Sequence, residues 1–313
     1  MSSKQIIAVF GATGAAGGSV AKYLLEDGTF AVRAVTRNAD SPAAQALKAK
    51  GAEVVVADLD KPETLPAAVK GAYGVSGLTD FWTIFPKLGD TAKTQQAEEA
   101  QGKALVDVAK AAGVKHFVWF SLWTSNVPHF EGKYQVEQYL KASGVPYTSF
   151  YNAFYYENLG KKDFGMLKKL EDGTYAVEIP FPEDAYIPSY SVDQSGGWVL
   201  EAFKKPEQYI GKTITAIGEH ITPKEIAAVL SKVFGKEVNA KPMAVDNFHG
   251  MAHAPNPFVV ELYLNMKYFF DNCQPPNSVY GAEAESKKIY PGQYTFEEFV
   301  RNNEAFKKAF ESL

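Results

Sequence analysis

Residues 5–18 of the chain read QIIAVFGATGAAGG, a short apolar run that passes directly into a glycine-rich turn. The run at residues 5–10 has the length and composition of a buried strand, and small apolar residues at helical spacing follow over residues 18–26. A strand, a glycine-rich turn and a helix in this order are typical of the first βαβ unit of a parallel sheet. This stretch therefore predicts an α/β fold.

The same alternation of strand and helix patterns continues to about residue 159. Further strands are expected at residues 31–36, 53–57, 74–78, 116–121 and 147–151. Helices are expected at residues 41–50, 61–69, 94–112 and 134–141. Successive βαβ units build a Rossmann-type, doubly wound parallel sheet, which we place in residues 1–159.

The character of the chain changes after residue 159, where prolines interrupt short strand patterns. Two Ser/Thr-x-x-Glu capping boxes, Thr222 with Glu225 and Thr295 with Glu298, each precede an apolar-periodic helix. We expect residues 160–313 to form a smaller α+β lobe, of which some segments can return to the Rossmann sheet. Ligands of open α/β sheets bind at the carboxyl ends of the strands, so this lobe is expected to form the other wall of that cleft.

Composition excludes several classes of protein. The 313 residues are 46% hydrophobic and 22% charged, as in ordinary globular chains, and no run approaches the roughly 18 apolar residues that span a membrane. The net charge is −4 and only three of 32 basic residues are arginine, which disfavours direct nucleic-acid binding. The single cysteine, Cys273, is expected to be a buried small side chain, and its isolation suits a reducing compartment. We expect a cytoplasmic protein, with a nuclear location as well if it is a regulator.

The glycine-rich turn has the spacing Gly-x-x-Gly-x-x-Gly, with Gly11, Thr13, Gly14, Ala16 and Gly17 as its expected contact residues. Such a turn lets the backbone approach a pyrophosphate, while the following helix offers unpaired amides and a positive dipole. The Gly-Lys-Ser/Thr ending of a nucleotide-hydrolase P-loop is missing, which argues against a kinase or ATPase. The position of the turn between strand and helix predicts dinucleotide binding, although a tight structural turn would use the same glycines.

The end of the second expected strand indicates which dinucleotide is bound. An acidic residue there would accept from the ribose 2′-hydroxyl of NAD, whereas this chain has Arg37 followed by Asn38. The guanidinium fits a 2′-phosphate, so NADP(H) is the expected cofactor; the alternative is a solvated surface arginine. Asp58 and Leu59 end the third strand, where they can meet the adenine, but Asp58 can equally cap a helix that starts near residue 62.

The usual proton-donating pair of short-chain dehydrogenases, Tyr-x-x-x-Lys, is not at its expected place. That spacing occurs only at Tyr263 and Lys267, deep in the second lobe, and chance alone accounts for it. After the fifth strand the chain instead has His129 four residues before Lys133. We expect Lys133 to bind and orient a ribose. His129 is a candidate proton donor, or a loop residue without a role.

Several motifs in order resemble the NmrA-like family of atypical short-chain dehydrogenases. They lie at residues 11–17, 32–38, 51–55, 71–73, 79–82, 129–133, 144–149 and 156–158. The resemblance runs from the first strand to about residue 159 and continues more weakly to the end. One departure is Phe150-Tyr151-Asn152, where relatives often have Arg-Leu-Pro.

This resemblance implies a Rossmann fold that binds NADP(H) and often lacks the catalytic tyrosine. The family includes a fungal nitrogen-metabolite repressor and an animal sensor of the NADPH level, and related reductases of phenolic substrates keep a lysine in the place of Lys133. It implies cofactor contacts from the glycine loop, Arg37, Asp58, Thr79, Lys133 and the loop 155–158, including Tyr155 and Asn158.

Two further signals are ambiguous. Aromatic residues gather near the expected cleft edge, where they can bind a flat substrate or pack the core: Phe81, Trp82, Phe85, Trp119, Trp123, Phe150, Tyr151, Phe154, Tyr155 and Tyr156. His249 and His253 are four residues apart, but they lack the glutamate of His-Glu-x-x-His and precede two prolines, so we expect no metal site.

Two functions follow from these patterns. The first is a redox-sensing regulator that binds a protein partner according to its NADP(H) state. The alternative is an NADPH-dependent reductase of a small apolar or aromatic carbonyl, imine or alkene, with Lys133 on the ribose and His129, Tyr155 or a water as proton donor. A third reading, a relative without cofactor, predicts no binding. The sequence leaves the substrate, the partner and the oligomeric state open.

Overall fold

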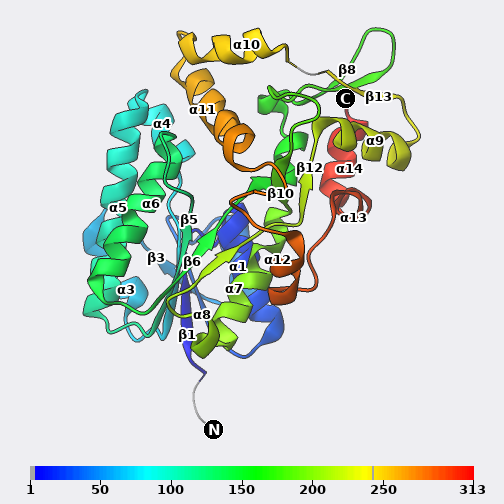
Figure 1. Ribbon diagram of the computed structural model, residues 1–313. Helices are drawn as coiled ribbons and strands as arrows, with labels where there is room; N and C mark the ends of the chain where they lie inside the picture. Colours follow the sequence, from blue (N-terminus) through cyan, green and yellow to red (C-terminus); the bar gives the residue numbers. More distant parts are fainter. Residues whose placement is uncertain (1–3, 242) are drawn as a thin grey trace. The chain divides into compact units, whose positions relative to one another are not determined.

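The computed structural model of the chain describes residues 4–241 and 243–313. It forms two compact units (Figure 1). The first runs to Asn152 and includes Asp193–Ile214, and the second consists of Ala153–Val192 and Thr215–Leu313. The chain therefore leaves the first unit after its sixth strand, at Asn152, and returns to it at Asp193.

The first unit is built on a seven-stranded sheet with the order β11-β6-β5-β4-β1-β2-β3. Its strands are β1 (Ile6–Val9), β2 (Ala31–Thr36), β3 (Glu53–Val56), β4 (Gly74–Gly77), β5 (His116–Ser121), β6 (Tyr147–Tyr151) and β11 (Thr213–Thr215). Strands β1 to β6 pair in parallel. The order reverses at β1, which lies between β4 and β2, so the crevice that binds ligands in such sheets opens where β1 ends. The predicted Rossmann-type fold and its six strands are confirmed.

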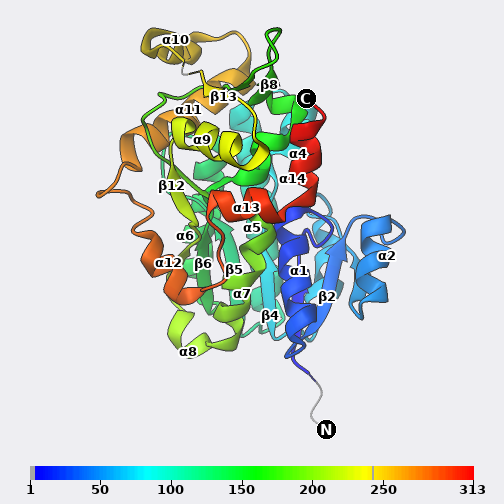
Figure 2. The same ribbon diagram turned by 90° about the vertical axis from the view of Figure 1, so that its right-hand side faces the viewer.

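Helices cover both faces of this sheet, as the two views show (Figures 1 and 2). On one face α1 (Ala15–Asp27) packs against α7 (Ser195–Lys204), and on the other α5 (Thr91–Ala111) packs against α6 (Pro128–Ser143). Shorter elements complete the unit: α2 (Pro42–Ala49), η1 (Pro62–Thr64), α3 (Leu65–Val69), α4 (Phe81–Leu88), η4 (Val192–Gln194) and α8 (Pro206–Tyr209). The returning segment is fastened to α1, because the Ser19 hydroxyl donates to the Asp193 carbonyl at 2.7 Å and accepts from the Gly196 amide at 2.9 Å.

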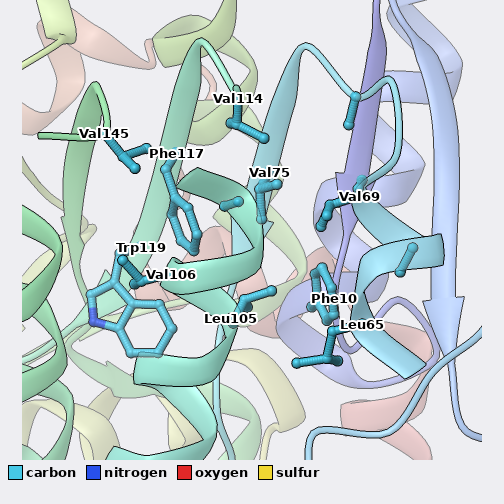
Figure 3. Close-up of a cluster of buried hydrophobic side chains, with 14 of the residues drawn as sticks. Phe10, Leu65, Val69, Val75, Leu105, Val106, Val114, Phe117, Trp119 and Val145 are labelled. Atoms are coloured by element: carbon cyan, nitrogen blue, oxygen red, sulfur yellow. The ribbon is translucent and has the colours of Figure 1, made fainter. Parts of the chain in front are cut away.

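The core between the sheet and the α5–α6 face is closely packed (Figure 3). Phe117 and Trp119 of β5 and Leu105 of α5 are fully buried there. Burying each such side chain stabilises the fold by about 1.5–3 kcal/mol. A Cβ atom at Gly102 would lie 2.5 Å from a Val136 methyl group, so this glycine allows α5 and α6 to approach closely. The helix pair and the sheet thus enclose one closely packed core.

Two helices differ from the sequence expectation. Helix α6 begins at Pro128 rather than at residue 134, because proline is well suited to the first turn of a helix even where the residue before it offers no side-chain cap. His129 is consequently helical, and its assignment to a loop is wrong. Helix α4, which contains Pro86, was not among the expected helices, and Asp80 caps it by accepting from the Trp82 amide at 3.1 Å.

The second unit contains two three-stranded sheets. One has the order β12-β10-β7, with β12 at Glu219–Ile221, β10 at Ile187–Tyr190 and β7 at Phe154–Tyr155. The other has the order β13-β9-β8, with β13 at Val238–Ala240, β9 at Tyr175–Val177 and β8 at Leu167–Lys169. Its helical elements are η2 (Tyr156–Gly160), η3 (Lys162–Phe164), α9 (Pro223–Phe234), α10 (Val245–Gly250), η5 (Met251–His253), α11 (Pro257–Asn272), α12 (Glu283–Ile289), α13 (Phe296–Asn302) and α14 (Glu304–Glu311).

Local signals define the helix starts of this unit well. Both predicted capping boxes are confirmed, at Thr222 with Glu225 before α9 and at Thr295 with Glu298 before α13. Cys273 is buried as expected, and burial raises the pKa of its thiol. Across residues 4–241 and 243–313, none of the helices is both long enough and apolar enough to cross a membrane.

Candidate functional site

The glycine loop joins β1 to α1 and leaves the start of the helix open. Gly14 is the N-cap residue of α1 and makes no side-chain bond, and the first turn carries no acidic residue. The loop is tight: the Gly14 amide donates to the Gly11 carbonyl at 2.9 Å, and Gly11 has φ of 63°. A Cβ atom at Gly17 would lie 2.3 Å from the Gly11 carbonyl oxygen, so only glycine fits there. Unpaired amides and a positive dipole at such a helix start favour an anion.

The surface around this loop is accessible to a ligand. Thr13 and Gly14 are exposed, and the Thr13 hydroxyl lies 3.4 Å from that of Thr36 at the end of β2. A depression of about 240 Å³ separates the loop from α2, and it is lined by Ala12, Thr13, Gly14, Gly18, Ala43, Ala46, Leu47 and Lys50. The side chains that line this depression are mostly small and apolar, so a flat group can approach the glycine backbone.

Arg37 follows β2 directly and is exposed. Within the described residues its guanidinium makes no hydrogen bond or ion pair. Its charge reaches Asp60: a hydrogen bond from Gln101 is the main cause that lowers the pKa of the Asp60 carboxyl, and Lys87 and Arg37 add to it. The arginine thus adds an uncommitted positive charge to the edge of the sheet that carries the glycine loop.

Asp58 and Leu59 are half-buried after β3. The Asp58 carboxylate accepts from the Asp60 amide at 3.1 Å, and the Asp58 amide donates to the Thr64 hydroxyl at 3.0 Å. The residue that precedes η1 as its N-cap is Lys61, so the alternative in which Asp58 caps the following helix is wrong. Asp58 instead shapes its own turn, which holds Leu59 at the edge of the sheet.

Lys133 on α6 points to the end of β4. Its ammonium donates to the Thr79 carbonyl at 3.0 Å and to the Thr79 hydroxyl at 3.3 Å, and it forms an ion pair with Glu98 of α5. The Thr79 hydroxyl donates to the same Glu98 oxygen at 2.9 Å. An ammonium has three N–H donors, and all three are used here. The predicted residues Thr79 and Lys133 are therefore brought together.

His129 lies one helical turn before Lys133 on α6 and is buried among aromatic rings. Its ring centroid is 5.7 Å from that of Phe81, 5.2 Å from that of Trp82 and 4.7 Å from that of Phe130. Phe81 is buried, whereas Trp82 is exposed. The imidazole and the exposed indole therefore form an aromatic surface next to the predicted lysine.

Sequence reasoning missed the two glutamates of this region. Glu98 and Glu137 are both fully buried, on α5 and α6. A signal was present for Glu98, which lies between Thr94 and Gly102 at four-residue spacing on the buried face of α5. Apart from Lys141, which lies four residues after Glu137 on α6, the partners of these carboxylates lie on other elements, so periodicity along one helix does not indicate their pairing.

The remaining predicted contact residues belong to the second unit. Tyr155 ends β7, where its ring makes an edge contact with that of Tyr190 at a centroid distance of 5.4 Å. Asn158 lies in η2, and its carbonyl accepts from the Lys161 amide at 3.2 Å. The glycine loop, Arg37, Asp58, Leu59, Thr79, Lys133 and His129 all belong to the first unit.

The Tyr-x-x-x-Lys spacing and the histidine pair of the second unit were the other candidate motifs, and their residues make local contacts. Tyr263 and Lys267 lie on α11, but the tyrosine hydroxyl is 3.2 Å from His249 Nδ1, and the lysine pairs with Asp271. Tyr263 and Lys267 thus have separate partners. Among the described residues, no group of three or more His, Cys, Asp or Glu side chains could hold a metal ion.

Comparison with known proteins gives concordant matches. The sequence model of the NmrA-like family matches residues 3–300. An NmrA-like family domain-containing oxidoreductase of Cladobotryum, FrzB, is 34% identical over 260 residues, which cover 76% of this chain and 76% of the relative.

Among solved structures, the negative transcriptional regulator NmrA in complex with NADP has a TM-score of 0.77 at 22% identity and covers 100% of this chain and 99% of its own. The same regulator in complex with NAD has a TM-score of 0.78 at 21% identity with the same coverage. The NADPH-dependent quinone oxidoreductase of Escherichia coli, complexed with NADPH, has a TM-score of 0.70 at 23% identity and covers 95% of this chain and 98% of its own. These structures share the fold.

Proposed function

The chain belongs to the NmrA-like family, and on that premise we propose that it binds NADP(H) at the glycine loop. The observation that carries this proposal is the open start of α1, which has neither a side-chain cap nor an acidic residue in its first turn, beside an exposed Arg37. A diphosphate there would accept from the loop amides. The guanidinium of Arg37 would hold the 2′-phosphate that distinguishes NADP from NAD.

Other residues of the first unit would orient the cofactor. Asp58 and Leu59 would lie on the adenine side, and Thr79 and Lys133 on the side of the nicotinamide ribose. Bound nicotinamide supplies or accepts a hydride. The donors of Lys133 are already used by Thr79 and Glu98, and the residue four positions before it is His129 rather than tyrosine.

We therefore propose that the protein is a regulator whose partner binding depends on its NADP(H) state. The lack of a tyrosine before Lys133 supports cofactor binding without a matched proton donor. The fold shared with a transcriptional regulator agrees with this role.

A reductase is the second candidate, and a specific observation favours it. His129 and Lys133 share one face of α6, and His129 contacts the exposed ring of Trp82, an arrangement that suits a flat aromatic carbonyl or alkene. In that case Lys133 would hold the ribose and His129 or a water would supply the proton. The name oxidoreductase of the Cladobotryum relative agrees with this candidate.

Calorimetric titration with NADPH, NADP and NAD tests the cofactor proposal. Arg37→Glu is expected to weaken NADPH binding by about 10- to 100-fold, the loss of one charge-assisted phosphate contact, while NAD binding is unchanged. Arg301→Glu is the matched control, because it makes the same charge change at an exposed arginine of the second unit. Equal weak affinity for NADP and NAD, together with no effect of Arg37→Glu, would refute the proposal.

Turnover separates the two roles. NADPH oxidation with a panel of quinones and aromatic enones, abolished by Lys133→Ala, would establish a reductase. Tight NADPH binding without turnover, and a protein partner that binds in only one redox state, would establish a regulator.

A further inference from the structure

The second unit holds a serine, a histidine and a glutamate in a hydrogen-bonded row. His220 on β12 has its Nε2 atom 2.7 Å from the Ser278 hydroxyl and its Nδ1 atom 2.5 Å from a Glu283 carboxylate oxygen. Ser278 lies in the loop between α11 and α12, and Glu283 is the first residue of α12 (Figure 1). Three separate elements thus meet at one imidazole.

The partners of His220 fix its tautomer. An ionised carboxylate only accepts hydrogen bonds, so Nδ1 carries the proton and Nε2 is left to accept from the Ser278 hydroxyl. Partial burial acts to raise the pKa of the Glu283 carboxyl, but hydrogen bonds from His220 and from the Glu283 backbone together outweigh it and hold the pKa below its ordinary value. This is the polarity in which a histidine acts as general base toward a serine hydroxyl.

The loop that carries Ser278 is fastened close to the serine. The Gln274 side chain accepts from the Tyr186 amide at 2.9 Å and donates to the Tyr186 carbonyl at 3.1 Å. The Tyr280 amide donates to the Ser278 hydroxyl oxygen at 3.2 Å. The imidazole is shielded, with 4% of its side chain exposed, whereas Ser278 is partly exposed. The hydroxyl is therefore held in position on a residue that is partly exposed.

We propose that Ser278, His220 and Glu283 form a hydrolytic site for small uncharged esters, separate from the cofactor site of the first unit. His220 Nε2 takes the hydroxyl proton as the Ser278 oxygen bonds to the ester carbonyl carbon. The alcohol then leaves with that proton, and Ser278 is acylated. A water molecule next loses a proton to His220 and attacks the acyl carbon, after which the carboxylic acid leaves and the serine recovers its proton.

The surroundings of the site select the substrate and limit the rate. Glu219 lies on the same strand as His220, and burial first, then the charges of Glu225, Glu283 and Glu298, raise the pKa of its carboxyl. This concentration of acidic groups disfavours esters with an anionic acyl or alcohol part. The Tyr280 amide donates to the Ser278 oxygen itself and not to the position that the ester carbonyl oxygen would take, so it does not stabilise the oxyanion and slow turnover is expected.

A serine-directed fluorophosphonate and p-nitrophenyl acetate test this proposal on the full chain. The fluorophosphonate is expected to label Ser278, identified by mass spectrometry of the peptide. Ester hydrolysis should fall by at least about tenfold in Ser278→Ala and in His220→Gln alike, because the nucleophile and its base act as a unit. Ser312→Ala, at an exposed serine whose hydroxyl donates to a carbonyl, is the matched control and should keep the wild-type rate.

Ser278→Ala keeps the loop anchor at Gln274, so its melting temperature should stay close to that of the wild type. If His220→Gln is less stable than the wild type, labelling of its Ser278 by the fluorophosphonate is the measurement used for that variant. No labelling of the wild type at Ser278, or hydrolysis that stays at the wild-type rate in Ser278→Ala, would overturn the proposal. NADPH titration of the same variants keeps this outcome distinct from failure of the cofactor site.

Discussion

Two buried glutamates of the first unit, Glu98 and Glu137, are held in different ways. Both are fully buried, on the adjacent helices α5 and α6. Each oxygen of Glu137 accepts two bonds, from Ser149 and Lys141 at 2.7 Å, and from Ser121 at 2.6 Å and Tyr151 at 2.8 Å. One Glu98 oxygen accepts from Thr79 and Lys133, and the other has no hydrogen-bond partner among the described residues.

This difference separates a carboxylate whose contacts are all fixed from one that can change its contacts. Both carboxylate oxygens of Glu137 already accept two hydrogen bonds, and these bonds link β5, β6 and α6. Glu137 therefore has no free acceptor position for a ligand. Glu98 keeps spare capacity beside the lysine that we assign to the ribose. It can therefore follow Lys133 when that lysine changes partners, and we regard it as a positioning residue for Lys133.

The largest effect is expected from Glu137→Ala. It leaves Lys141 and three buried hydroxyls without their common acceptor, which should lower the free energy of unfolding by about 3–5 kcal/mol. Equilibrium urea unfolding measures this loss. Glu26→Ala, at an exposed glutamate of α1, is the control and should change stability by less than about 0.5 kcal/mol. A small effect of Glu137→Ala would remove the contrast between the two glutamates.

The lysines that pair with the two glutamates, Lys133 with Glu98 and Lys141 with Glu137, give a matched pair of variants. Lys133→Met leaves the buried Glu98 charge with only the Thr79 hydroxyl and should cost about 3 kcal/mol. Lys141→Met should cost about 1 kcal/mol or less, because this lysine is 37% exposed and three hydroxyls still satisfy Glu137. The same unfolding measurement compares them, and equal losses would contradict the assignment.

The buried imidazole of His116, in the same sheet, extends the comparison from buried carboxylates to a buried base. His116 of β5 has one partner, the Thr148 hydroxyl at 2.7 Å, and burial lowers its pKa to about 4. The unfolded chain takes up a proton near the ordinary pKa of 6.5, whereas the folded chain does so only near 4, so acid favours unfolding. Between pH 6 and pH 4.5 this residue should reduce stability by about 2 kcal/mol.

Unfolding of the wild type and His116→Asn over that pH range isolates the contribution, because carboxylates titrate alike in both proteins. Parallel pH profiles would show that the pKa of His116 is the same in the folded and the unfolded chain. In that case burial with too few hydrogen-bond partners would not be enough to keep the imidazole of His116 neutral in this sheet.

The smallest effects are expected from the amide variants. Glu98→Gln can place its amide nitrogen where the oxygen has no partner, and it should cost about 1 kcal/mol. Glu137→Gln must replace an oxygen that accepts two bonds and should cost about 2 kcal/mol. Calorimetry adds a readout of function: Glu98→Gln should change NADPH affinity, whereas Glu137→Gln should leave it as it is. The reverse order in either measurement would contradict the comparison.

The sequence predicted the parts of the fold that local pattern determines. The six strands of the first unit, the glycine loop and the two capping boxes all follow from apolar runs and helix-start residues, and the structure has them where expected. Helix α4 was missed because Pro86 argues against a helix, although a proline near the end of so short a helix is accommodated. The start of α6 was missed because Val127 offers no cap signal.

The site could be predicted only in part. The glycine loop and Arg37 are contiguous with strands that the sequence shows, so their placement follows from the fold. The pairing of Lys133 with Glu98 joins residues of two helices, and the Glu137 cluster joins one helix to two strands. Such contacts depend on packing between elements, which periodicity along one element does not contain.

The fastening of Asp193 and Gly196 to Ser19 has a consequence for synthesis on the ribosome. A Cβ atom at Gly196 would lie 2.4 Å from the Ser19 carbonyl, so α7 closes tightly over α1, yet it is translated only after residues 153–192. At about 5–20 residues per second, the nascent first unit waits roughly 3 to 12 seconds between residue 152 and residue 214 with one face of its sheet incompletely covered. An expression fragment that ends at residue 152 would keep that exposed face permanently, and we expect it to be recovered as aggregate or with a chaperone attached.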